Sequence, residues 1–133
     1  PALQPAQIDT ALQHGGTHPY VLKTLRVQFL AGGPKAGIKT VLRAAAKQLV
    51  PFFEACLMAV EPGERRLLRW LVKKGKPVNP KEAAKALKMP SAKAAADALC
   101  YLGVVSRWNL EDGAKLHASC RLFNEWYLSA RRG

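Results

Sequence analysis

The spacing of hydrophobic residues in the first part of the chain predicts helices. Ile8, Ala11 and Leu12 recur at the period of one helix face, and the paired glycines at 15–16 follow as a C-cap. Further helical patterns continue as far as residue 60. The sequence therefore predicts a small helical unit over residues 1–60.

Two more helices are expected in this unit. Thr17 is a suitable N-cap for the second helix, and Pro19 fits its first turn, where a missing N–H costs nothing. The third helix is expected over about residues 38–60. Because Pro51 lies inside it and removes a backbone donor, a kink or break is predicted at Val50.

The second part of the chain begins with three short helical patterns. The segment ERRLLRWLVKKG places leucines on one helix face and ends at Gly75. Asn79 then caps a helix that starts at Pro80, and Ser91 caps a third helix that ends before Gly103. Short helices joined by a tight turn are typical of a helix-turn-helix.

A β-hairpin and a last helix are expected after these three. The strands are predicted at Val104–Trp108 and Ala114–Ala118, joined by the loop NLEDG, and the amphipathic helix over residues 120–130. Three helices followed by a hairpin is the order of a winged helix-turn-helix. The predicted fold is therefore mainly α, with a small helical unit (residues 1–60) followed by a winged helix-turn-helix domain with one β-hairpin (residues 61–133).

The helix that would read DNA in such a domain has few side chains for reading. Recognition helices place Arg, Lys, Asn or Gln against base edges in the major groove. Over residues 91–102 the polar side chains are Ser91, Lys93, Asp97 and the Tyr101 hydroxyl, and most other positions are alanine. Two interpretations stay open: this helix enters the groove with little discrimination, or it packs on its neighbours through its alanines.

The charge of the chain favours an anionic partner. Lys and Arg number 21 against 9 Asp and Glu, a net charge of +12, and the balance from residue 61 onward is +8. Charges of this kind hold phosphates and carry no sequence information, so we predict binding to duplex DNA mainly through its backbone. A basic surface that is merely solvated is the alternative. The predicted DNA-binding residues are Arg65, Arg69, Lys81, Lys85, Lys88, Ser91, Lys93, Arg107, Trp108 and Lys115.

Two roles stay open for Trp108, at the end of the first predicted strand. It can stack on a base or wedge into a groove, or it can pack as a hydrophobic hairpin residue on the last helix.

Catalytic and metal-binding patterns are not found in the sequence. The three cysteines, Cys56, Cys100 and Cys120, lack CxxC spacing and are expected to be reduced thiols in the core of a cytoplasmic protein. No Ser-His-Asp arrangement, carboxylate pair or GxxxxGK[ST] phosphate loop occurs. No apolar run reaches the roughly 18 residues that a membrane helix needs. The chain is therefore expected to hold no metal and to catalyse no reaction by itself.

Several segments resemble one protein family. GGTHPYVLKTL at residues 15–25 resembles the GGHPYLL-type segment in the helical lid of AAA+ and STAND ATPases, such as archaeal-type ATPases and origin-recognition-like proteins. ERRLLRWLV, ALCYLGVVSR and CRLFNEWYL are similar to the winged-helix domain that follows that lid. The resemblance covers nearly the whole chain, through short hydrophobic motifs.

The resemblance implies that the chain is the C-terminal lid and winged helix of a larger ATPase. A start at Pro1 rather than Met agrees with a fragment or processed product. The parent would bind ATP or ADP with Mg, whereas this part lacks the P-loop core and is expected to hold no cofactor.

The family also implies roles for particular residues and partners. Its lid proline turn lies near the bound nucleotide, which implies a nucleotide contact for His18 and Pro19, although Thr17 stands where the family commonly has a second glycine. A plain helix start is the alternative for this pair. The winged helix of the family either binds DNA or docks on the ATPase core, and an acidic protein is a further partner that the charge allows.

Overall fold

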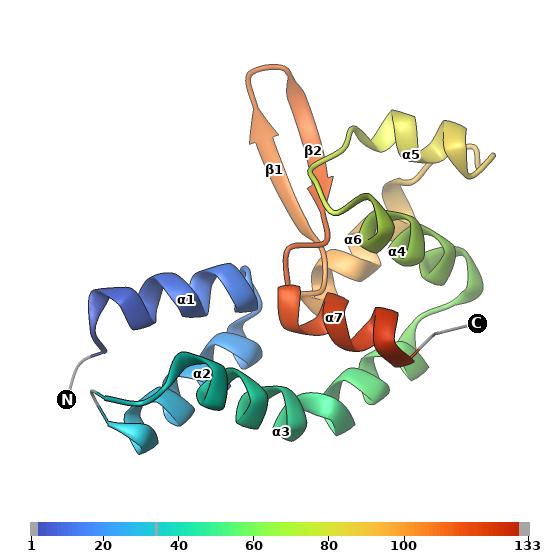
Figure 1. Ribbon diagram of the computed structural model, residues 1–133. Coiled ribbons are helices and arrows are strands. Elements are labelled where there is room, and N and C mark those ends of the chain that lie inside the picture. The colour runs from blue at the N-terminus through green and yellow to red at the C-terminus, as the bar shows by residue number, and fades with distance from the viewer. Residues whose placement is uncertain (1–2, 34, 131–133) are drawn as a thin grey trace. The chain divides into compact units, whose positions relative to one another are not determined.

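The computed structural model describes residues 3–33 and 35–130, and these form a mainly α fold with one β-hairpin (Figure 1). They divide into two compact units, one made of residues up to Ala55 together with those from Cys120 onward, and the other of Cys56–Ser119. The elements are α1 (Pro5–Gly15), α2 (Pro19–Gly32), α3 (Ile38–Ala59), α4 (Pro62–Lys74), α5 (Pro80–Ala86), α6 (Lys93–Leu102), β1 (Ser106–Leu110), β2 (Gly113–His117) and α7 (Arg121–Ala130).

The first unit is a helical cluster in which α1 packs on α2 and on α7. The aromatic ring of Phe53 on α3 meets Phe123 edge-on at 5.3 Å between ring centres, and Trp126 lies 5.6 Å from the same ring. Such aromatic pairs bury a large apolar area. They explain why the last helix belongs with the first unit rather than with the winged helix that precedes it in sequence.

The helix α3 is continuous through Pro51, so the alternative of a break at Val50 is wrong, and the alternative of a kink there stays a prediction. One proline removes a single backbone hydrogen bond. Leu49 and Phe53 on either side of it are fully buried, and their packing offsets that loss. The division between the two units falls within this helix, between Ala55 and Cys56.

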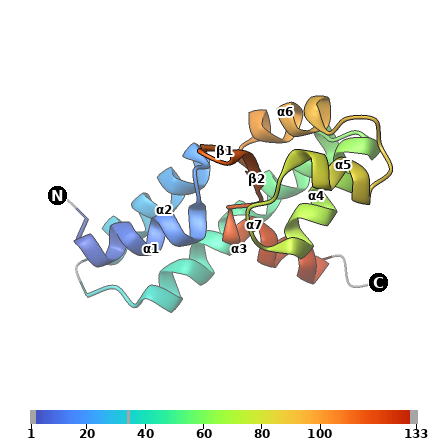
Figure 2. The same ribbon diagram turned by 90° about the horizontal axis from the view of Figure 1, so that it is seen from above.

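The second unit is a winged helix-turn-helix made of α4, α5, α6 and the hairpin. Helix α4 packs on α6 and on β2, and both views show these elements together (Figures 1 and 2). The segment before α5 joins the hairpin, because Val78 and Leu116 exchange backbone hydrogen bonds of 2.9 and 2.7 Å. In the described part of the chain, β1 pairs with β2 alone and so forms the edge of this small sheet.

The hairpin is shifted from its predicted position. The strands begin at Ser106 and Gly113 rather than at Val104 and Ala114. Val104 and Val105 are buried core residues in the bend after Gly103, so their apolar character reflects packing and not a strand. The strands are joined directly through Glu111 and Asp112, since Leu110 pairs with Gly113.

Leu116→Ala is expected to lower the free energy of unfolding by about 2–5 kcal/mol, because the side chain is fully buried and its loss leaves a cavity. Leu110→Ala in the same hairpin is the matched control. Its side chain is 53% exposed, so its effect is expected to stay within about 0.5 kcal/mol. Urea unfolding followed by circular dichroism measures both, and equal effects would contradict the described packing.

Lys88→Gly is expected to raise the free energy of unfolding by up to about 1 kcal/mol. Lys88 has φ +54°, a left-handed conformation that glycine adopts without strain. Lys85→Gly, one turn earlier and inside α5, is expected to have the opposite sign because glycine destabilises a helix by about 1 kcal/mol. The same denaturation experiment compares them, and destabilisation by both changes would show that position 88 is not strained.

Candidate nucleic-acid interface

A groove of about 390 Å³ lies where α5, the turn after it and the start of α6 meet, all within the second unit. Three cationic side chains line it, from Lys81 on α5, Lys93 on α6 and Arg107 on β1. The hydroxyl-bearing Ser91 lines it as well. The structure thus brings together four of the ten predicted DNA-binding residues around one concave surface.

Local capping places the two helix starts at this groove. The Asn79 side chain accepts a hydrogen bond of 2.8 Å from the Lys81 N–H, as predicted, and Pro80 occupies the first turn of α5. Ala92, rather than the predicted Ser91, is the N-cap of α6, and the Ser91 hydroxyl oxygen accepts a hydrogen bond of 3.1 Å from the Lys93 N–H. Each short polar side chain therefore satisfies a donor at a helix start, where the backbone has no helical partner.

The small residues of α5 and α6 give the groove its depth. Ala84, Ala92 and Ala96 line it together with two prolines, and Ala92 and Ala96 are almost fully buried. A longer side chain at these positions would occupy the space that the groove leaves open. Ala96 on α6 thus both packs in the core and borders the groove, whereas Ala94, Ala95 and Ala98 on the same helix do not line it.

The exposed face of α6 remains sparse in base-reading groups. Its exposed residues include Lys93, Ala94 and Asp97, and Tyr101 is 91% exposed near the end of the helix. Of these, the lysine is a donor for phosphates or guanine, whereas the carboxylate repels phosphates. The arrangement agrees with the expectation of little sequence discrimination, which itself stays a prediction.

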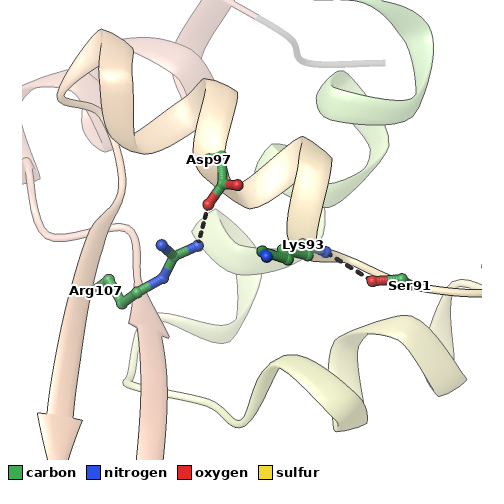
Figure 3. A network of polar contacts seen from close by, with 4 residues as sticks. All are labelled: Ser91, Lys93, Asp97 and Arg107. Carbon is green, nitrogen blue, oxygen red and sulfur yellow. Dashed lines mark hydrogen bonds and ion pairs between the residues drawn. The ribbon is translucent and has the colours of Figure 1, made fainter.

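The wing is tied to α6 by an ion pair (Figure 3). Arg107 Nη2 donates to Asp97 Oδ1 at 2.7 Å, with side chains 37% and 50% exposed. The hydrogen bond to Asp97 is the main cause that raises the pKa of Arg107 above its ordinary value, so the guanidinium stays charged. In Figure 3 the Lys93 side chain extends from α6 toward Arg107, so two cations face the groove with one carboxylate beside them.

The other predicted cations on the helices have different surroundings. Lys85 and Lys88 are exposed near the end of α5, and Arg69 is exposed on α4, but none of the three lines the groove. Arg65 is partly buried, and its guanidinium donates to the Leu57 carbonyl at 2.8 Å. Arg65 therefore stabilises the end of α3. This hydrogen bond gives Arg65 a structural role that does not require a bound phosphate.

The wing carries an exposed aromatic residue and charges of both signs. Trp108 is 42% exposed and pairs across the hairpin with Lys115, whose ammonium lies 3.5 Å from the Asp112 carboxylate. Glu111 and Asp112 place two acidic side chains at the turn. Burial lowers the pKa of His117, so this imidazole is mainly neutral at pH 7 and adds little positive charge.

The structure gives His18 and Pro19 a role at the start of α2. His18, rather than the predicted Thr17, is the N-cap: its Nδ1 accepts from the Val21 N–H at 3.4 Å. The imidazole is buried and meets the Phe52 ring edge-on at 5.2 Å, while Pro19 is the first helical residue. Capping and packing thus account for this pair, and the nucleotide contact implied by the family resemblance stays a prediction.

Two features of the interface were missed from sequence. The Asp97–Arg107 pair joins positions ten residues apart, which no helical spacing brings together. Arg66 is not among the predicted site residues, yet its guanidinium donates to the Leu87 carbonyl at 2.5 Å and holds the turn between α5 and α6. The Asp97–Arg107 ion pair and the Arg66–Leu87 hydrogen bond both form only when separate elements pack together. The local spacing of residues therefore gives no signal for either contact.

The residues that the structure describes show neither a metal-binding cluster nor a membrane-spanning helix. Within them, no group of three or more His, Cys, Asp or Glu side chains is placed to hold a metal ion, and no helix combines the length and apolar character that crossing a membrane requires. A comparison of the chain with models of known families, with curated proteins and with solved structures finds no match.

Proposed function

We propose that the second unit binds duplex DNA, mainly through backbone phosphates. The observation that carries this proposal is the groove in which Lys81, Lys93 and Arg107 come together from three separate elements. Cationic side chains bind phosphate oxygens through charge-assisted hydrogen bonds, and the Ser91 hydroxyl offers a further donor. Exposed Lys85 and Lys88 extend the positive surface along α5.

The proposed binding has little sequence preference. Base readout needs donors and acceptors directed at base edges, and the exposed face of α6 offers chiefly Lys93, with Ala94 able to contact a thymine methyl group. Asp97 opposes close approach of phosphates to the same face. Affinity then comes mainly from backbone charge, which is sensitive to salt.

We propose further that the chain is the lid and winged-helix part of an AAA+ or STAND-type ATPase whose core binds ATP or ADP with Mg. This rests on the resemblance of the HPYVLKTL and ALCYLGVVSR segments and on their order along the chain. The order of α1–α3 before the winged helix-turn-helix supports the same reading, whereas α7, which the resemblance assigns to the winged helix, groups with the first unit.

A docking module is the second candidate, and specific observations favour it. Tyr101 is 91% exposed on α6, and the wing turn carries the carboxylates of Glu111 and Asp112, which repel DNA. An exposed aromatic residue beside small alanines suits a protein surface, such as the ATPase core of the same protein or an acidic partner reached through the basic helices.

Salt titration of DNA binding separates the two candidates. If about four to six cations neutralise phosphates, log affinity for a duplex falls with log salt at a slope of roughly −4 to −5. Lys81→Ala is expected to reduce the slope by about one unit. Arg65→Ala is the control for a cation already bound to a carbonyl, and its slope should stay unchanged. Fluorescence anisotropy measures these values, and absence of binding at low salt would favour docking.

Asp97→Asn is expected to raise duplex affinity about two- to fivefold, because it removes a negative charge from the groove and releases Arg107. Glu111→Gln removes one charge from the same wing turn, outside the groove lining and without separating Lys115 from Asp112, and is expected to have a smaller effect. Anisotropy at fixed salt compares the two variants. Equal gains would mean that net charge alone, and not the Arg107 contact, limits binding.

A further inference from the structure

We propose that the groove at the start of α6 preferentially binds a terminal phosphate monoester, the phosphorylated end of a nucleic acid. This inference rests on the proposed function and names the part of the DNA that the groove takes. Three features support it: the charge of the groove, the shape of the groove, and the exposed ion pair between Arg107 and Asp97.

The charges that line the groove match a monoester better than an internal phosphate. Lys81, Lys93 and Arg107 bring three positive charges, and Asp97 offsets one of them. A phosphate monoester carries about −1.5 to −2 at pH 7 and has three acceptor oxygens. An internal phosphate of a strand carries only one negative charge. The net positive charge of the groove is therefore neutralised more fully by a terminal phosphate monoester than by one internal phosphate.

The shape of the groove favours an isolated group over a continuous strand. The lining cations come from three separate elements, α5, α6 and β1, and border one hollow of about 390 Å³. Ala84 and Ala96 leave the hollow open, and Ser91 lies beside it with a hydroxyl hydrogen that can turn toward a ligand. A terminal phosphate can enter such a hollow, whereas an internal phosphate is held by sugars on both sides.

The Asp97–Arg107 pair makes this site selective. The Asp97 carboxylate accepts a hydrogen bond of 2.7 Å from the Arg107 guanidinium. The carboxylate therefore lies where an anionic ligand of Arg107 would bind. Both side chains are partly exposed, so a partner exchange needs little desolvation. A dianionic group competes with the carboxylate more strongly than a monoanionic one because its attraction to the guanidinium is larger.

The test compares DNA hairpins of one sequence that end in a 5′-hydroxyl, a 5′-phosphate or a 3′-phosphate, bound to the full chain. The 5′- or 3′-phosphate is expected to raise affinity about tenfold over the hydroxyl end, the size of one added charge-assisted hydrogen bond. Comparison of the 5′-phosphate hairpin with the 3′-phosphate hairpin shows which phosphorylated end the groove binds. Phosphoserine peptide and inorganic phosphate serve as competitors.

Variants assign the effect to the groove. Lys93→Ala and Arg107→Ala are each expected to remove the preference for a phosphorylated end. Lys85→Ala changes an exposed lysine outside the groove lining, so it should lower affinity for all hairpins equally and keep the preference. Ala84→Leu fills the hollow without changing charge and should also remove the preference. Circular dichroism checks each fold, and the exposed Lys93 supplies the test if Ala84→Leu does not fold.

Each result decides between the two proposals. Equal affinity for hydroxyl and phosphorylated ends would overturn the inference, while salt-dependent binding of all hairpins would leave the proposed function intact. Retention of the preference in Lys93→Ala would also overturn it. Stronger competition by phosphoserine peptide than by a phosphorylated hairpin would assign the groove to a protein ligand instead. Failure to bind any hairpin at low salt would overturn both proposals.

Discussion

The backbone pairing of Val78 with Leu116 is the contact on which the second unit depends. It ties the segment before α5 to β2, and the fully buried Leu116 side chain anchors that pairing to the core. Helix α5 begins two residues after Val78, and β1 is paired with β2 throughout. Lys81 and Arg107 can therefore share one groove only while this pairing holds.

Local signals allowed much of the fold to be predicted. Asn79 acts through its side-chain cap, and Pro80 and Gly103 act through their backbone geometry, so the helix boundaries that depend on them were predicted closely. The hairpin was predicted but misplaced, because buried Val104 and Val105 have the same apolar character as strand residues. The grouping of α7 with the first unit could not be predicted, since it depends on contacts between Phe53 and residues about seventy positions later.

The candidate site was less predictable than the fold. Sequence identified the cations, but it could not separate those that face solvent from those that hold carbonyls, as Arg65 and Arg66 do. It left two roles open for the alanines, groove entry or packing, and could not show a hollow between α5 and α6, because that hollow depends on small residues that lie next to one another only after folding. The net charge can be counted from the sequence, whereas the positions at which charged side chains come together depend on the tertiary structure.

The edge formed by β1 bears on how the protein behaves at high concentration. An edge strand presents unpaired backbone groups to which the strand of another molecule can add, a common route to aggregation. Here Arg107 on the strand and its ion-pair partner Asp97 place charged side chains of both signs beside the edge. Charged side chains beside an edge strand disfavour such addition. The features that form the wing thus also disfavour edge-to-edge association between copies of the chain.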